Sequence, residues 1–237
     1  MDWIKIRAVA RKENGYYFAS PIGYIILSLF LLANGYFFTL ITLRSREASM
    51  AAFFQTSVTL LLFLTPGITM RLWSEEEKNG TGELLKTSPL SSWEIVLGKY
   101  LGACFFFGVM LSSSLIYLAL LFAFGKPDLG PVFSNYLGYS LEAMTFISLG
   151  LLVSTLSENQ VVSMVVTWVL LVMLWVLGAA AEMIQGRWGD FLKLLSLFEH
   201  HTDFYKGVID LTHVFYFMSL IFLGLFFSVK VLEAKRN

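Results

Sequence analysis

The chain of 237 residues is 57% hydrophobic, 16% aromatic and only 14% charged, and its formal net charge at pH 7 is zero. Soluble domains usually carry about 25% charged residues, so this composition excludes an ordinary soluble enzyme, and it excludes an intrinsically disordered chain for the same reason. The lack of a basic excess argues against a nucleic-acid partner, because such binding needs Lys and Arg to neutralise phosphates.

Six apolar runs are long enough to cross a bilayer, which takes about 20 mostly apolar residues. The runs are continuous and do not alternate between apolar and polar residues, which favours helices over the strands of a barrel. The sequence therefore predicts an all-α membrane protein with six transmembrane helices in a single domain over residues 1–237. The predicted spans are 22–43, 50–72, 99–124, 132–156, 161–181 and 212–232.

The distribution of Lys and Arg predicts the orientation of the spans, because cytoplasmic segments of membrane proteins are enriched in these residues. With the N-terminus inside, the inner segments hold Lys5, Arg7, Arg11, Lys12, Arg71, Lys78, Lys86, Lys99, Lys230, Lys235 and Arg236. The outer segments then hold only Arg44, Arg46, Lys126, Arg187, Lys193 and Lys206. This asymmetry predicts a multi-pass protein of the cytoplasmic (inner) membrane with both termini in the cytoplasm.

The N-terminal residues 1–15 precede the first span and mix apolar residues such as Trp3 and Ile6 with basic residues such as Lys5 and Arg11. This pattern predicts a short basic helix that lies on the inner leaflet and stops at Asn14-Gly15.

The predicted external segment, 182–211, precedes the last span. Within residues 187–203, polar residues recur at helical spacing, which predicts one amphipathic helix on the outer face that does not cross the membrane. Its end carries residue types that bind metals, including His200 and His201. Adjacent histidines point apart on a helix, so a solvated outer face is favoured over a metal site, and no metal ligand is assigned.

The segment 74–91 lies between the second and third spans. Residues 75–78 extend the second helix into water, and Arg71 is spaced to pair with Glu75. Gly80-Thr81-Gly82 breaks that helix, and Thr81 can cap a new short helix that Ser88-Pro89 ends.

Leu84 and Leu85 belong to this second short helix. They are expected to be exposed on a cytoplasmic tip, and exposed apolar residues there predict docking into a groove of a partner protein.

The same segment resembles the coupling region of ABC type-2 transporter permeases, and the subgroup of gliding-motility and copper-enzyme-maturation permeases is the most similar. Further matches are Ser20-Pro21-Ile22-Gly23-Tyr24, Leu97-Gly98-Lys99-Tyr100, Ser157-Glu158-Asn159-Gln160 and the run 204–210, so the resemblance spans nearly the whole chain. Gly82 departs from the pattern, since the family usually has a larger apolar residue there, and this weakens the expected rigidity of the docking helix.

The resemblance implies a transmembrane subunit that pairs with a second permease, identical or paralogous, and docks a cytoplasmic ABC ATPase. ATP and magnesium would bind the ATPase, so this chain would carry no cofactor. The chain also has no G-x-x-x-x-G-K-[ST] phosphate loop of its own. Export of a substrate is expected over import. The residues that match the coupling region are Glu76, Glu77, Lys78, Gly80, Thr81, Glu83, Leu84, Leu85 and Pro89.

Three polar residues inside the spans are candidates for a translocation path. Glu142 lies deep in the fourth predicted span, where a carboxyl group is costly and should face the interior of the bundle. Ser112 and Ser113 lie in the third predicted span. The alternative is that Glu142 fixes helix packing through a hydrogen bond and that the serines bond to their own helix backbone.

Two other functions remain open from the sequence. The chain can be a secondary transporter that uses an ion gradient, with Glu142 as the coupling acid. It can also be the membrane anchor of a mechanical or motility ATPase complex. Gly98-x-x-x-Gly102 is expected to let helices approach closely, within the chain or between subunits.

Overall fold

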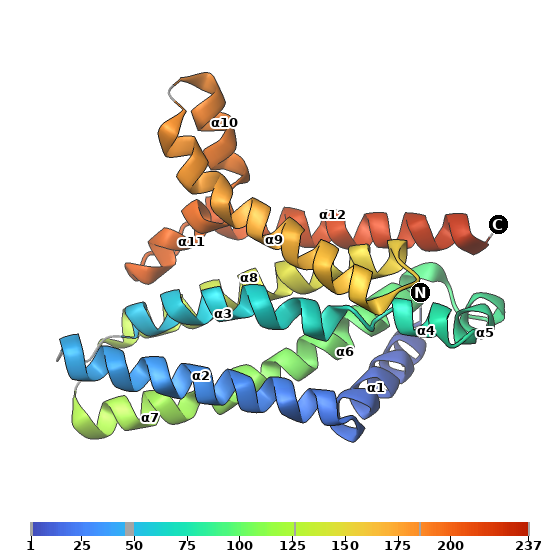
Figure 1. The fold of residues 1–237 in the computed structure, drawn as a ribbon, viewed down its shortest axis with the longest axis horizontal. Coiled ribbons are helices and arrows are strands. Elements are labelled where there is room, and N and C mark those ends of the chain that lie inside the picture. Colours follow the sequence, from blue (N-terminus) through green and yellow to red (C-terminus); the bar gives the residue numbers. More distant parts are fainter. Residues whose placement is uncertain (1, 46–49, 126, 185, 237) are drawn as a thin grey trace.

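The computed structural model describes residues 2–45, 50–125, 127–184 and 186–236, except the side chains of residues 44 and 45. These residues form helices joined by short connections and contain no strand (Figure 1). The helices are α1 (Trp3–Ala19), α2 (Pro21–Ser45), α3 (Ala51–Thr69), α4 (Ser74–Lys78), α5 (Thr81–Thr87), α6 (Ser92–Ser113), α7 (Leu115–Phe124), α8 (Leu129–Leu156), α9 (Gln160–Met183), α10 (Arg187–Leu195), α11 (Leu197–Tyr205) and α12 (Leu211–Arg236).

Six helical stretches in the described ranges are long and apolar enough to cross a membrane, which confirms the predicted number of spans. The third begins at Ser92, earlier than expected, because Ser91 and Glu94 form a capping box that starts α6 before the apolar run. The stretches are Pro21–Leu43, Ala51–Lys78, Ser92–Phe124, Leu129–Leu156, Gln160–Met183 and Leu211–Arg236.

Helix α8 lies at the centre of the bundle. It contacts α3, α6, α9, α11 and α12, and in its most apolar window 67% of the residues are buried, the largest share among the six spans. By contrast, only 17% of the corresponding window of α2 is buried. The helix that carries Glu142 is therefore the one around which the others pack, and α2 lies at the periphery.

Helix α1 continues to Ala19, so the predicted stop at Asn14-Gly15 is wrong. Tertiary packing overrides the local stop signal, because the Tyr17 ring stacks on Phe106 of α6 with ring centroids 4.7 Å apart. The Tyr17 hydroxyl also donates to the Ile68 carbonyl oxygen over 2.8 Å. Ser20 then ends α1, and Pro21 opens α2 as its first residue, a position that suits proline because no backbone N–H is needed there.

The motif Gly98-x-x-x-Gly102 is where α1 packs on α6. A Cβ added at Gly98 would lie 2.5 Å from Val9 Cβ, and one added at Gly102 would lie 2.7 Å from Glu13 Cβ. These distances are too short for any side chain, so the two glycines are what allows the close approach. The contact lies within the chain, which settles one of the two alternatives left open by the sequence.

Both termini lie at the same end of the bundle as α4 and α5 (Figure 1). Lys5 Nζ donates to the Pro89 carbonyl oxygen over 2.8 Å, and an Arg236 guanidinium nitrogen donates to the Leu90 carbonyl oxygen over 3.0 Å. An even number of spans requires this arrangement. That this end faces the cytoplasm stays a prediction, and two of the cations that the prediction places on the outer side, Arg46 and Lys126, lie outside the described residues.

The expected single helix over 187–203 is in fact two helices, α10 and α11, which break at Ser196. Ser196 adopts an extended backbone, and its hydroxyl accepts the Glu199 N–H at the start of α11. In Figure 1, α10 packs beside the end of α9, away from the other long helices, whereas α11 contacts α3, α8 and α9. Leu197 and Phe204 of α11 are fully buried, so the amphipathic pattern marks a packing face and not a solvated outer helix.

We expect Gly98→Ala to lower the thermal unfolding temperature of the detergent-solubilised protein, because the new methyl group overlaps Val9. Overpacking of this kind costs about 1–3 kcal/mol. The matched control is Gly108→Ala in the same helix, where an added Cβ meets nothing within 4 Å. Equal unfolding temperatures for the two variants would contradict the packing of α1 on α6.

Candidate functional site

The tip, defined as residues 74–91, comprises α4, a turn, α5 and the residues that lead into α6. Ser154 of α8 holds its start, because the Ser154 hydroxyl accepts the backbone N–H groups of Trp73 and Ser74 over 2.9 and 3.2 Å. Gly80 then has φ of 71°, a left-handed conformation that favours glycine and turns the chain sharply from α4 to α5.

The N-cap of α5 is Gly80, so the expectation that Thr81 caps this helix is wrong. The Thr81 hydroxyl instead donates to the carboxylate of Glu76. The Thr81 hydroxyl therefore bonds the Glu76 side chain across the turn and does not cap the start of α5.

Glu76 is buried, which corrects the expectation that residues 75–78 extend into water; only 7% of its surface is exposed. Its carboxylate accepts a hydrogen bond from Lys12 Nζ over 2.8 Å and lies 3.3 Å from Lys99 Nζ. Lys99 is itself 1% exposed and bonds Glu13 over 2.5 Å. We call these four side chains the ion cluster, in which Glu13, Glu76 and Lys99 are buried and Lys12 is exposed, and it joins α1, α4 and α6.

Glu77 forms a second set of bonds on the neighbouring face of α4. Its Oε1 accepts hydrogen bonds from Trp73 Nε1 and Lys86 Nζ, both over 3.0 Å, and lies 3.4 Å from Lys235 Nζ near the end of α12. The tip is therefore bonded to α12 as well as to α1 and α6. The expected pair of Arg71 and Glu75 is confirmed, at 2.9 Å.

The exposed surface of the tip is smaller than the sequence suggests. Leu84 is 71% exposed, as predicted, but Leu85 packs against the hydrophobic core, so its predicted exposure is wrong. Lys78, Gly80, Glu83 and Pro89 are exposed. Gly82, the departure from the family pattern, is buried, and a Cβ there would lie 3.1 Å from a Glu77 carboxylate oxygen. The missing side chain makes room for Glu77.

Glu142 is fully buried and faces the interior of the bundle, which confirms its expected direction. Its carboxylate lies against Nδ1 of His201, a residue of α11 that is 1% exposed. The solvated surface expected for His201 is therefore wrong, since α11 inserts beside the middle of α8. This contact ties the external segment to the centre of the bundle.

Ser112 and Ser113 bond to their own helix. The Ser112 hydroxyl donates to the Gly108 carbonyl oxygen over 2.7 Å, and the Ser113 hydroxyl donates to the Met110 carbonyl oxygen over 2.5 Å. A place for these serines and Glu142 in a translocation path stays a prediction.

The sequence analysis missed Glu13 and His201 as interaction partners. The signal for Glu13 was available, because a lysine at the start of a span, Lys99, needs an acid close by. For His201 there was no such signal, since only the packing of α11 against α8 brings it to Glu142.

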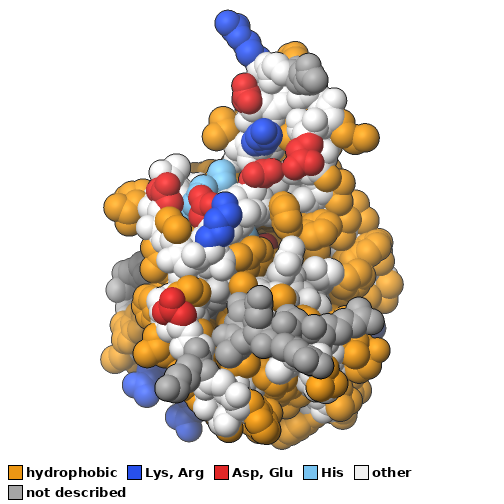
Figure 2. Space-filling model, turned by 90° about the vertical axis from the view of Figure 1, so that its left-hand side faces the viewer, with side chains coloured by type: hydrophobic (Ala, Val, Ile, Leu, Met, Phe, Trp, Pro, Cys, Tyr) orange, Lys and Arg blue, Asp and Glu red, His pale blue; other side chains and the backbone are white. Residues whose placement is uncertain are grey.

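The external segment carries a polar cluster around Asp203. Asp203 accepts a hydrogen bond from Lys206 Nζ over 2.9 Å and lies 3.0 Å from His213 Nε2. The edge of the His200 ring packs on Tyr216, with ring centroids 3.7 Å apart. Figure 2 shows acidic, basic and histidine side chains gathered on this end of the molecule. Within the described ranges, no group of three or more His, Cys, Asp or Glu residues is arranged to hold a metal ion.

Burial, together with the neighbouring His213, lowers the pKa of His200 from 6.5 to about 4. The hydrogen bonds from Lys206 and His213 lower the pKa of Asp203 below its ordinary value. As the pH falls from 6.5 towards 4, His200 in the unfolded chain gains a proton that the folded chain does not bind. Asp203 stays ionised over this window, so His200 gives this segment its acid sensitivity.

We expect the free energy of unfolding to fall as the pH is lowered from 6.5 to about 4. The measurement is the thermal unfolding temperature of the wild type and of His200→Gln across this range. The variant should show a shallower pH dependence, because it removes a group whose charged form is disfavoured by folding. An identical dependence in both proteins would show that His200 is not responsible.

Lys99→Met should destabilise the protein by about 3–5 kcal/mol, because it leaves Glu13 and Glu76 buried with fewer cationic partners. Adding Glu13→Gln to this variant should restore part of the loss, since one of the two acids then needs no counter-charge. The control is Lys78→Met, which removes an exposed cation from the same tip. Thermal unfolding in detergent measures all three, and a Lys99→Met protein as stable as the control would refute the role of the cluster.

A family model described as "ABC-2 family transporter protein" matches residues 64–228, from the end of α3 to within α12. The match covers more than half of the chain and includes the tip, Glu142 and the external segment. Comparison with curated proteins gives no match. On the strength of the family match and the six apolar helices, this multi-pass membrane chain belongs to the ABC-2 transporter family and is a permease subunit of an ABC transporter.

Proposed function

We propose that the chain couples ATP hydrolysis by a separate cytoplasmic ABC ATPase to the export of a substrate, and that the tip is where the ATPase docks. The observation that carries the proposal is the position of Leu84. This leucine is 71% exposed on α5, and the preceding helix α4 is bonded to α1, α6 and α12 through Glu76 and Glu77. An exposed apolar residue on a firmly held support is suited to a partner groove.

The bonds behind the tip suggest how a push on α5 would reach the spans. Glu76 bonds Lys99 at the start of the third span, and Glu77 lies beside Lys235 at the end of the sixth. Glu76 and Glu77 also lie at the end of the second span, which runs to Lys78. Displacement of the tip would therefore move the ends of three spans together, and we propose that this switches the path between inward-open and outward-open states.

The catalytic parts of the transporter are assigned to other chains. Because this sequence has no phosphate loop, ATP and magnesium would bind the partner ATPase. A second permease, identical or paralogous, would complete the path in the inner membrane, with both termini and the tip in the cytoplasm. Membership of the gliding-motility and copper-enzyme-maturation subgroup stays a prediction from the sequence.

Leu84→Glu should weaken binding of the ATPase by at least tenfold. The change removes the burial of a leucine side chain, worth about 1.5–3 kcal/mol, and each 1.4 kcal/mol is a factor of ten in affinity. Co-purification of the ATPase encoded beside this chain measures the effect, and thermal unfolding of the permease alone should show little change.

The matched control is Leu129→Glu, which makes the same change at a residue that is 64% exposed. Leu129 is the first residue of α8, whereas Ser154, near the other end of α8, contacts the tip. It should leave ATPase binding intact. If Leu84→Glu binds its ATPase as well as this control does, the docking role of the tip is wrong. Leu85→Glu is a poorer probe, because Leu85 is half-buried against the core and the change would also disturb that packing.

A second function, secondary transport driven by a proton gradient, is favoured by one observation, the buried contact of Glu142 with His201. A carboxyl group beside an imidazole can exchange a proton within the bundle. Flux into proteoliposomes that contain only this chain separates the two functions. Transport driven by a proton gradient without ATPase, and lost in Glu142→Gln, would support the second function against the first.

A further inference from the structure

Helix α1 presents three differently used faces. One face carries Ile6, Val9 and Glu13 and is buried against α6. A second carries Lys5 and Lys12, which bond the tip at the Pro89 carbonyl oxygen and at Glu76. The third carries Trp3, Arg7 and Arg11, and none of the contacts described so far involves it.

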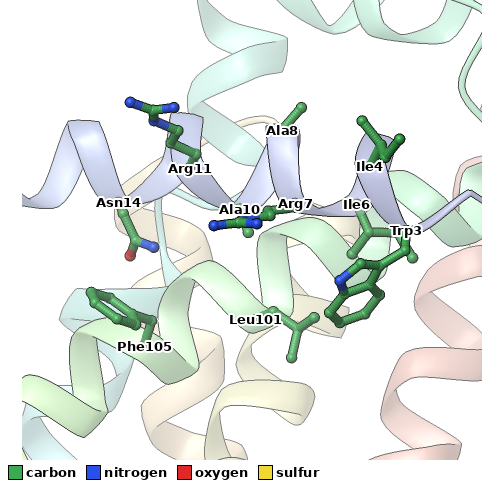
Figure 3. Close-up of a pocket in the computed structure, with 10 residues that line it drawn as sticks. All are labelled: Trp3, Ile4, Ile6, Arg7, Ala8, Ala10, Arg11, Asn14, Leu101 and Phe105. Atoms are coloured by element: carbon green, nitrogen blue, oxygen red, sulfur yellow. The ribbon is translucent and has the colours of Figure 1, made fainter.

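This third face lines a groove between α1 and α6 with a volume of about 1020 Å³. Figure 3 shows Trp3 and Asn14 of α1 near Leu101 and Phe105 of α6, with Arg7 between them in this view. One wall is therefore basic and polar and comes from α1, and the other is apolar and comes from α6. The groove is lined by Trp3, Ile4, Ile6, Arg7, Ala8, Ala10, Arg11, Asn14, Leu101 and Phe105.

The basic wall has unsatisfied groups. Arg7 and Arg11 are exposed, and neither forms an ion pair with any residue that the structure describes. The Oδ1 atom of Asn14 is buried in the protein without a hydrogen-bond partner. Arg7 and Arg11 are one helical turn apart on α1, so their long side chains can both reach a single anion with several acceptor oxygens.

The apolar wall lies in the membrane. Leu101 and Phe105 belong to the third span, Ser92–Phe124, and Phe105 is 56% exposed on its outward surface. Trp3, which is 65% exposed, has the amphipathic ring that is enriched where a bilayer meets water. The groove therefore runs from the interface into the hydrocarbon region.

We propose that this groove binds one anionic phospholipid of the leaflet on the tip side. Its phosphate would bind Arg7 and Arg11, and an acyl chain would lie along Leu101 and Phe105. A soluble anion would leave the apolar wall uncovered, and a zwitterionic lipid would leave part of the positive charge without compensation. The inference goes beyond the proposed function and does not depend on the ATPase, because every residue involved lies away from Leu84.

The test compares lipid retention by the purified full-length chain, without ATPase, in native mass spectrometry. The protein is mixed with phosphatidylglycerol and phosphatidylcholine of matched chain length in equal amounts. We expect preferential retention of phosphatidylglycerol by the wild type, and a loss of roughly tenfold or more in Arg7→Gln/Arg11→Gln, since each cation near an anionic lipid contributes about fivefold. The control Lys78→Gln/Lys230→Gln removes two exposed cations elsewhere and should retain the lipid.

Three results would overturn the proposal. The first is equal retention of the two lipids by the wild type. The second is competition by glycerol phosphate as effective as that by the whole lipid, which would show that the apolar wall plays no part. The third is a change in oligomeric state, with no change in lipid retention, in Arg7→Gln/Arg11→Gln, which would make this face a protein interface. Arg7→Lys/Arg11→Lys keeps the charge and should keep most of the lipid, and circular dichroism checks that each variant is folded.

Discussion

The buried ammonium group of Lys99 is the constraint on which the tip-side half of this structure depends. An unpaired charge at this depth would cost several kcal/mol, so two carboxylates must reach it. Glu13 reaches it only because α1 lies directly on α6, and that contact requires Gly98 and Gly102. Glu76 reaches it from α4, at the end of the second helical stretch, which fixes the tip. One lysine therefore determines where both the N-terminal helix and the tip lie.

The number of spans could be predicted from the sequence because it depends on the length of apolar runs, a property of each segment alone. The break at Gly80 and the pair of Arg71 and Glu75 could be predicted for the same reason, since both are set by residues close in the chain. The burial of Glu76 and of Leu85 could not, because each depends on a distant segment that packs against it. In the candidate site, the exposure of Leu84 was predicted correctly, and the errors concern Glu76 and Leu85, which pack against other segments.

The external segment is a second case in which contacts with distant residues could not be predicted from the local sequence. Its polar residues recur with helical spacing, and a solvated surface explains that pattern as well as a packed one does. Ser196 divides the segment, so that α11 packs against α3, α8 and α9 while α10 packs beside the end of α9. His201 and Glu142 meet because of this division. The local pattern predicts that this segment is helical. Which element each helix face contacts depends on the packing of the whole bundle.

The two halves of the structure differ in how their buried charges are held, and this bears on how the permease can move. At the tip end, Lys99 has two acidic partners on two different helices, so the helices there are bonded into one unit. At the other end, Glu142 and His201 form one charged contact between α8 and α11, beside the packing of Phe204 on Gly138. A network with several charged partners resists separation more than one charged contact does. Helix α1 extends the bonded unit to the membrane surface, because Lys12 bonds the tip while Arg7 and Arg11 face the lipid groove. A lipid held by these arginines would therefore brace the same helix that supports the docking tip.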